Sequence, residues 1–360
     1  MKQATKKEEK ALFANIQKKK IRKRMPFSVM YELTYLCNFK CPHCYLGDQG
    51  QNKKKELNTS GVKKVLDELV DMGVYQIGFT GGEPMVRKDI FEILEYANRK
   101  GLYIALLTNG YLIDAKTADK LKKVNVDKID ITLNSLDPDT FTGLSGVRGS
   151  CEKVRKAIDL LLERGMQVKI KSSGTCLNRD EIVDISKFAR EKNIPYLIDG
   201  EILPCRDGYS AWVDKFSLDA ETLYDIRKQV YPEMFAPCKN GKKRKRSRTK
   251  RRRDKVFTCG VGMASFSINP YGKMNFCLEI DYPKCDILKD GAVACWEKMK
   301  KEIDKIEKRV SEGDFICRDC NLLPYCGWCA GRSYIETGSF NRCSEYFKKR
   351  ATINKRLRNR

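Results

Sequence analysis

Residues 37–45 read CNFKCPHCY and follow the apolar run SVMYELT at residues 28–34. The β-branched and aromatic side chains of this run predict a strand. Cys37, Cys41 and Cys44 then share one loop at its carboxyl end, with the spacing C-x3-C-x2-C. Three thiolates can hold three corners of an iron–sulfur cubane and leave one iron open, whereas a structural cluster normally takes four cysteines. The alternative is a loop whose fourth ligand lies elsewhere in the chain.

Short apolar runs and amphipathic segments alternate after this loop. The first amphipathic segment has apolar residues at helical spacing from Val62 to Val70, can begin at Asn58 or Thr59, and ends at Gly73. The predicted strands are 28–34, 74–80, 102–107, 128–133, 167–172 and 196–199, and the further predicted helices are 90–98, 115–123, 152–164 and 179–192.

This alternation predicts an α/β fold with a parallel sheet covered by helices. Six strand–helix units are too few for a closed eight-stranded barrel, so we expect an open, partial (β/α)6 barrel. In such folds the functional residues lie at the carboxyl ends of the strands.

The alternation stops after Cys205. We expect a basic N-terminal segment at 1–27, the barrel at 28–205, a linker with a basic insertion at 206–256, a cysteine-rich domain at 257–347 and a basic tail at 348–360. The cysteine-rich domain is expected to be organised by its ligands rather than by a large core.

The composition narrows the class of protein. No run of eighteen apolar residues is present, and the lysine-rich stretch from Met1 to Arg24 lacks the apolar segment of a signal peptide, so a cytoplasmic protein is expected. In a reducing compartment sixteen cysteines indicate metal or cluster ligands more than disulfides. The single histidine, His43, leaves little scope for mixed Cys/His zinc sites.

The net charge is +24, and ten of the twelve residues from Lys242 to Arg253 are basic. Such a run is either a solvated, disordered insertion or a docking strip for an acidic peptide or nucleic acid. Both readings stay open.

The cysteine loop, followed by the aromatic Tyr45, resembles the signature of the radical S-adenosylmethionine (SAM) superfamily. The next predicted strand runs into TGGEP at residues 80–84, which resembles the family segment that holds the methionine amino group. The resemblance implies that the open iron binds SAM, whose cleavage gives a 5′-deoxyadenosyl radical. It also implies cofactor contacts from Gly81, Gly82, Glu83 and Pro84, with Glu83 as an acceptor.

Later strand ends add candidates for cofactor contacts. Thr108 and Asn109 follow the third strand, and Ser135 lies in the segment that resembles the ribose-contacting part of the family. Asp137, before a proline, serves equally well in a turn. Arg148 or Arg155 could meet the cofactor carboxylate, or could be solvated helix residues.

The C-terminal cysteines resemble a SPASM domain, which carries two auxiliary [4Fe–4S] clusters. The resemblance assigns Cys317, Cys320, Cys326 and Cys343 to one cluster, and Cys259, Cys277 and Cys329, with Cys238 as fourth ligand, to the other. Three clusters are therefore expected in all. The chain has two residues between Cys326 and Cys329, where the family usually has three. A zinc ribbon is the alternative for paired CxxC motifs, and without Cys238 the second auxiliary cluster would have an open iron for substrate.

Five cysteines stay outside these sets and are expected to be mostly small buried side chains: Cys151, Cys176, Cys205, Cys285 and Cys295. Cys205 is also a candidate hydrogen-atom donor near the active site. Asp199 and Glu201, at the end of the sixth predicted strand, are candidate general bases, with a surface turn as the alternative.

The resemblance favours an enzyme that modifies a C–H bond of a ribosomal peptide by crosslinking, epimerisation or oxidation. The alternatives are the same chemistry in a haem-pathway decarboxylase or sulfatase maturase, and a non-catalytic iron–sulfur or nucleic-acid-binding protein. The expected partners are a precursor peptide and an electron donor such as flavodoxin or ferredoxin. Because the region before Ser28 is too short for a winged-helix domain, a leader would be recognised by a separate leader-binding protein, by the core domains or by the basic run. Neither a membrane nor a nucleic acid is expected as a partner.

Overall fold

The computed structural model describes residues 6–47, 55–206, 208, 210–235, 255–309 and 315–358. Cys238 and the basic run at 242–253 lie outside the described residues, so the expectations placed on them stay predictions.

One sheet runs through the described structure, in the order β6-β5-β4-β3-β2-β1-β7-β8-β9. The first six strands are parallel neighbours, as predicted: β1 (Ser28–Thr34), β2 (Gln76–Gly81), β3 (Tyr103–Thr108), β4 (Lys128–Thr132), β5 (Val168–Ser173) and β6 (Tyr196–Asp199). The parallel order confirms the partial barrel expected from the sequence.

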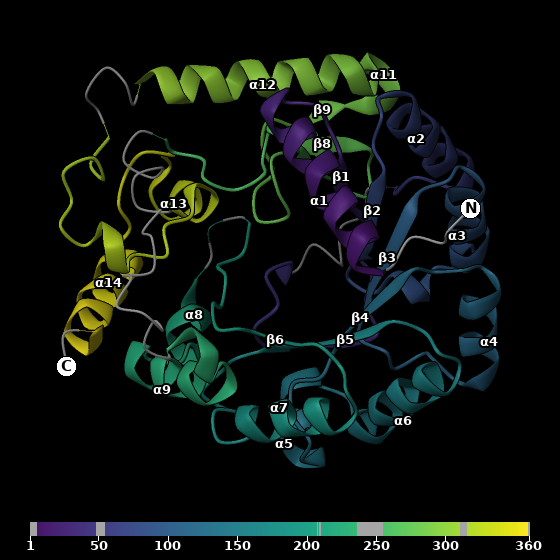
Figure 1. Cartoon of the computed structure of the whole chain (residues 1–360), viewed down its shortest axis with the longest axis horizontal. Helices are drawn as coiled ribbons and strands as arrows, with labels where there is room; N and C mark the ends of the chain where they lie inside the picture. Colours follow the sequence, from purple (N-terminus) through teal and green to yellow (C-terminus); the bar gives the residue numbers. More distant parts are fainter. Residues whose placement is uncertain are drawn as a thin grey trace.

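Helices cover the outer side of these strands (Figure 1). They are α2 (Thr59–Asp71), α3 (Ile90–Arg99), α4 (Ala115–Lys123), α5 (Pro138–Ser145), α6 (Ser150–Glu163) and α7 (Ile182–Glu191). Helices α8 (Ala211–Phe216) and α9 (Ala220–Val230) follow β6. Short 3-10 turns occupy Pro84–Val86, Pro232–Met234 and Leu323–Tyr325.

Local sequence signals explain where these helices begin and end. Asn58 caps α2, because its side chain accepts a hydrogen bond from the backbone N–H of Gly61, and Gly73 ends the turn after the helix with a φ of +86°. Asp137 caps α5 by accepting from Thr140, with Pro138 in the first turn. The turn alternative proposed for Asp137 is therefore the observed one, although the helix after it was not predicted.

The C-terminal part is joined to the barrel by the sheet itself. β7 (Ser265–Ile268) pairs in parallel with β1, and β8 (Lys273–Asn275) and β9 (Cys285–Asp286) continue the sheet in antiparallel order. Helices α11 (Ile287–Asp290), α12 (Ala292–Arg309), α13 (Ala330–Thr337) and α14 (Glu345–Arg358) complete this part. Figure 1 shows α14 beside α9, and Arg356 forms an ion pair with Glu221 between them.

The cysteine-rich part has an apolar core, which differs from the expectation of a domain organised by ligands. A single buried cluster extends from the barrel strands into this part. Phe266 of β7 packs on Trp296 of α12 with ring centroids 5.5 Å apart, and Phe315 packs on Trp328 at 5.9 Å. Aromatic residues scattered between the cysteines supply this core. The basic N-terminal segment forms α1 (Lys6–Arg22), and most of the basic tail lies in α14.

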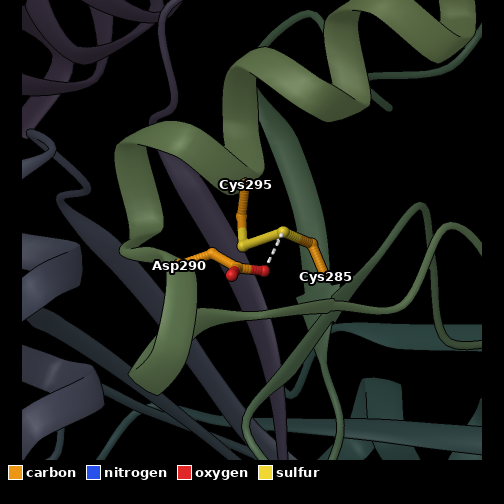
Figure 2. A group of neighbouring side chains, drawn as sticks. All are labelled: Cys285, Asp290 and Cys295. Carbon is orange, nitrogen blue, oxygen red and sulfur yellow. Dashed lines mark hydrogen bonds between the residues drawn. A yellow bond between two sulfur atoms is a disulfide. The ribbon is translucent and has the colours of Figure 1, made fainter.

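Two cysteines expected to be separate are bonded to each other. Cys285 of β9 and Cys295 of α12 are both buried and form a disulfide, and Cys285 Sγ lies 3.5 Å from Asp290 Oδ2 (Figure 2). Their burial agrees with the sequence analysis, whereas their bond does not. The disulfide fastens the β-hairpin of the C-terminal part to α12.

Among the described residues, the longest helices are too polar to cross a membrane.

Trp296 tests whether the two parts share one core. Its ring is buried, and its Nε1 donates to the Arg24 carbonyl at 3.1 Å. Trp296→Ala should lower the free energy of unfolding by about 3–5 kcal/mol in one cooperative transition. Val293→Ala, on the exposed side of the same helix, should cost little. Denaturant titration followed by circular dichroism measures both, and a separate early transition in Trp296→Ala would contradict the single core.

Candidate active site at the carboxyl ends of the strands

Cys37, Cys41 and Cys44 lie on the loop after β1 and line one cavity of about 240 Å³. The cavity also receives residues from the ends of β2, β3 and β4, which the sequence analysis expected to meet there. The candidates that line it are Cys37, Cys41, Cys44, Tyr45, Gly81, Gly82, Thr108 and Asn109. The parallel sheet thus brings four separate chain segments to one site.

The two glycines of TGGEP are needed because the cysteine loop lies directly against them. A Cβ on Gly81 would collide with the Thr34 carbonyl oxygen, and one on Gly82 with the Leu36 carbonyl oxygen. The backbone N–H of Gly82 donates to Thr34 at 2.8 Å, and that of Glu83 donates to Leu36 at 2.9 Å. This close approach fixes the start of the cysteine loop.

Glu83 joins the ends of β2 and β3. One carboxylate oxygen accepts from Thr108 Oγ1 at 2.7 Å and from the Met85 N–H at 3.0 Å, while the other accepts from the Asn109 N–H at 2.7 Å. The side chain is buried, with Pro84 buried beside it. Both oxygens are thus engaged by the protein, so the cavity receives the backbone of Gly81 and Gly82 rather than the Glu83 carboxylate. Contact of Glu83 with a cofactor stays a prediction.

The end of β3 also supports the cysteine loop. Asn109 Nδ2 donates to Asn38 Oδ1 at 2.8 Å and lies 3.9 Å from Cys37 Sγ. Such contacts orient a ligand loop before a metal binds.

Ser135 and Arg148 do not line the cavity. The buried Ser135 hydroxyl donates to the Glu181 carboxylate, which also accepts from the Leu136 N–H at 3.1 Å. Arg148 is exposed in the turn before α6. The neighbouring Asn134 faces the cavity instead, and its Oδ1 accepts from the Ser173 N–H at 2.9 Å.

Two buried charges beside the cysteine loop were not predicted from the sequence. Glu32 of β1 is 1% exposed, and its Oε1 accepts from Arg206 Nη2 at 2.6 Å. Arg206 also donates to Tyr35 Oη and to the Leu278 carbonyl, each at 2.7 Å, and its guanidinium lies 5.3 Å from the Tyr45 ring. Arg206 thereby connects the strand, the cysteine loop and the turn after Cys277. A glutamate within the apolar run SVMYELT was the signal available in the sequence.

A second missed group forms the inner wall of the cavity. Asp130 of β4 is 6% exposed, with Lys128 Nζ at 2.7 Å and Lys171 Nζ at 2.9 Å. Asp130 and Lys171 both line the cavity. The sequence feature that could have identified these residues is the alternation of charged and apolar residues in the fourth and fifth strands. This alternation directs the charged side chains to the inner face of the sheet.

The candidate bases and Cys205 lie outside this cavity. Glu201 accepts from Tyr346 Oη at 2.7 Å and lies 3.6 Å from Arg332 and 3.7 Å from Arg350, so it ties the barrel to α13 and α14. Asp199 is exposed, and its Oδ1 accepts from the Glu201 N–H at 3.2 Å. Cys205 is buried against Gly47, just beyond the cysteine loop. Catalytic roles for the three residues stay predictions.

The thiols of the loop fit an iron–sulfur cluster by their chemistry. Burial raises the pKa of Cys37 to about 11 and that of Cys41 to about 12. Burial also lowers the pKa of His43 to about 4, so the ring is neutral. A bound cluster would deprotonate these thiols, so its binding would release protons.

Some of the C-terminal cysteines lie near one another, and their division into two ligand sets stays a prediction. Cys320 raises the pKa of Cys343 by its charge, after the larger effect of burial, and Cys317 and Cys320 share one turn. In the other set Cys329 and Cys277 both approach Glu279. Within the described ranges, the sole trio of Cys, His, Asp or Glu ligand atoms closer than 4.8 Å is the disulfide pair with Asp290.

The pKa of Glu83 gives a pH-dependent test. Burial raises it from 4.5 to about 7, so the folded protein holds the proton more tightly than the unfolded chain does, and stability falls as pH rises between these values. Glu83→Gln removes this titration. From pH 4.5 to 8 the difference in unfolding free energy should shift in favour of the variant by roughly 3 kcal/mol. Thermal melts at several pH values measure it, with Glu95→Gln on an exposed face as control, and parallel curves would refute the assignment.

The Arg206–Glu32 pair gives a second test. Arg206→Met leaves a buried carboxylate without its partner and should cost about 3–5 kcal/mol, and adding Glu32→Gln should recover part of this loss. The exposed Arg179→Met should be near neutral. Denaturant titration measures the free energy of unfolding. If Arg206→Met and Arg206→Met/Glu32→Gln have the same value, the two side chains are not coupled.

Comparisons with known proteins agree with this geometry. Residues 31–190 match the model of the radical SAM superfamily. The chain is 26% identical over 333 residues to an AdoMet-dependent heme synthase of Oleidesulfovibrio alaskensis, covering 86% of this chain and 84% of that protein. It is 32% identical over 145 residues to a PqqA peptide cyclase of Granulibacter bethesdensis, covering 40% of this chain and 39% of the relative.

Solved structures share the fold. SuiB of Streptococcus suis, bound to its precursor peptide SuiA, matches with a TM-score of 0.66 and 17% identity over 96% of this chain and 82% of SuiB. The enzyme anSMEcpe, with bound AdoMet and a peptide, matches with a TM-score of 0.65 and 17% identity over 92% of this chain and 97% of anSMEcpe. Both likenesses include the cysteine-rich C-terminal part. Residues 31–190, which contain the three-cysteine loop and the glycine segment beside it, are thus the part of the chain that is similar to radical SAM enzymes.

Proposed function

We propose that this protein is a peptide maturase that uses radical SAM chemistry to modify a C–H bond of a ribosomal precursor peptide. The observation that carries the proposal is the pairing of the barrel with a cysteine-rich part through β1 and β7. The same fold occurs in SuiB with its precursor peptide and in anSMEcpe with a peptide, and a PqqA peptide cyclase is among the relatives.

Cys37, Cys41 and Cys44 would hold the catalytic cluster, and their cavity would hold SAM against Gly81 and Gly82. When bound, the cluster and SAM would together supply a 5′-deoxyadenosyl radical for abstraction of a hydrogen atom from the substrate. The apolar Phe39, Leu107 and Phe141 on the cavity wall keep water from this radical.

The charges on the wall have a positioning role in this proposal. Lys171 is fixed by its ion pair with Asp130, so it presents an oriented N–H group to the cavity. Glu83 and Arg206 hold the surrounding strand ends and loop in place. A preorganised wall spares the reaction the cost of ordering these groups.

We further propose two auxiliary [4Fe–4S] clusters, one held by Cys317, Cys320, Cys326 and Cys343 and the other by Cys259, Cys277 and Cys329 with a fourth ligand. An external electron donor such as flavodoxin or ferredoxin would reduce the enzyme. A leader-binding protein, or the basic run at 242–253, would recruit an acidic precursor peptide.

Thiolate-bound clusters suit the reducing cytoplasm, and burial shields the Cys285–Cys295 disulfide from the reductants of that compartment.

The second candidate is the same chemistry on a haem precursor. The AdoMet-dependent heme synthase relatives match most of the chain, whereas the peptide cyclase matches 40% of it. The two candidates differ in substrate, so a parallel assay separates them. Reduced, reconstituted enzyme with SAM should change the mass of a precursor peptide encoded beside its gene and leave iron-coproporphyrin III unchanged. The reverse result would favour the haem candidate, and no reaction of either substrate would refute the peptide proposal.

Replacing all three loop cysteines tests the proposed cluster set. Wild-type protein should bind about twelve irons, and Cys37→Ala/Cys41→Ala/Cys44→Ala about eight, because one four-iron cluster is lost. Formation of 5′-deoxyadenosine should fall to background in this triple variant. Cys176→Ala removes an exposed thiol outside all three ligand sets and should keep the iron and the activity. Residual cofactor cleavage in the triple variant would contradict the assignment.

A further inference from the structure

Glu279 lies among the three described cysteines of one proposed auxiliary cluster. Cys329 Sγ donates to Glu279 Oε2 at 3.3 Å. A Cβ on Gly331, in the first turn of α13, would stand 3.5 Å from both Cys277 Sγ and Glu279 Oε2. The carboxylate and the two sulfurs therefore converge on the same point of the fold.

The chain geometry keeps these groups together. Cys277 and Glu279 belong to one tight turn, closed by the bridge between Cys277 and Ile280. Arg206 holds this turn by donating to the Leu278 carbonyl at 2.7 Å. Cys329 lies directly before α13. The turn and the helix thus present a carboxylate and two thiols from two separate elements.

Glu279 and the three cysteines are all possible ligands for a cation once they are ionised. Glu279 is partly buried and interacts electrostatically with Cys259, Cys277 and Cys329. Four groups that are anionic when ionised repel one another in such surroundings unless metal compensates them. Arg332 also interacts with Glu279.

Arg332 is already engaged by other groups. It is 1% exposed, and it donates to Glu336 at 2.7 Å and to the Ile202 carbonyl at 3.0 Å. Its guanidinium lies 3.4 Å from the centre of the Tyr346 ring. It therefore offsets only part of the charge that four ionised groups would bring.

We propose that Glu279 is the fourth protein ligand of the auxiliary cluster held by Cys259, Cys277 and Cys329. A cubane has four irons, three thiolates leave one without a protein ligand, and a carboxylate oxygen can occupy that corner. This inference rests on the auxiliary clusters of the proposed function but not on its peptide substrate.

Cluster binding replaces the hydrogen bond between Cys329 and Glu279. The thiol proton leaves to solvent, the sulfur binds one iron, and the carboxylate oxygen binds another, with no electron transferred. An oxygen donor is harder than a thiolate, so this iron differs from the other three and should be the first to leave on oxidation once Glu279 is removed.

The test uses the full chain in the triple-alanine background at Cys37, Cys41 and Cys44, so that only auxiliary clusters contribute. Glu279→Gln, Glu279→Cys and Cys238→Ala are each added to it. Glu336→Gln is the matched control, because Glu336 also neutralises Arg332 but has no cysteine among its hydrogen-bond and ion-pair partners in the described structure. Each protein is labelled with ¹³C at glutamate carboxyl groups and reconstituted without oxygen. Iron analysis and pulsed EPR of the reduced clusters are the readouts.

We expect a ¹³C coupling in the background protein that Glu336→Gln and Cys238→Ala retain and Glu279→Gln and Glu279→Cys lose. Mild oxidation of Glu279→Gln should release about one iron and give a [3Fe–4S] signal. Glu279→Cys should keep about eight irons, with a shifted EPR spectrum of an all-thiolate cluster. This variant keeps the test decisive if Glu279→Gln does not fold.

A ¹³C coupling that persists in either Glu279 variant, or a cluster lost through Cys238→Ala but not through Glu279→Gln, would overturn the assignment of Glu279 alone. A background protein with only about four irons would overturn it together with the proposed number of clusters. The peptide assay is unaffected by either result, so failure of the proposed substrate is scored separately.

Discussion

The hydrogen bonding of β1 to a parallel neighbour on each side is the constraint on which the rest of the structure depends. β2 pairs with β1 on one side and delivers the glycine segment to the cysteine loop, while β7 pairs on the other side and begins the cysteine-rich part. Parallel neighbours end at the same edge of a sheet, so both arrive where the three-cysteine loop starts. The position of β1 therefore determines where the cavity at the cysteine loop forms and where the cysteine-rich part begins.

Buried carboxylates fix the strand ends and loops around β1. Glu83 accepts a hydrogen bond from the end of β3, Glu32 forms an ion pair with Arg206, and Asp130 forms ion pairs with two lysines on the inner face of the barrel. Each carboxylate is costly to bury, and each is compensated by hydrogen bonds or cations that come from another segment. Their effect is to fix strand ends and loops relative to one another, which a radical enzyme requires of its cofactor pocket.

Most strands and helices of the barrel were predictable from the sequence. The contacts that join the barrel to the cysteine-rich part were mostly not. β1, α4 and β6 begin and end at the predicted residues, because periodicity and caps are local signals. Arg206, Glu279 and Arg332 were missed, since nothing near them in the chain distinguishes them from surface charges. The contact of Glu201 with Tyr346, a residue of α14 that is far away in sequence, was not predicted either.

By itself the sequence determined the chemistry: three thiols on one loop, a glycine segment one unit later, and a second group of cysteines. These are spacings within short segments, which the chain order preserves whatever the fold. Only the tertiary structure decided that Glu83 supports a strand end, that Asn134 rather than Ser135 faces the cavity, and that a glutamate stands among the C-terminal thiols. Such roles depend on which distant donors and charges surround a side chain once its own segment is packed, and local spacing carries no information about those neighbours.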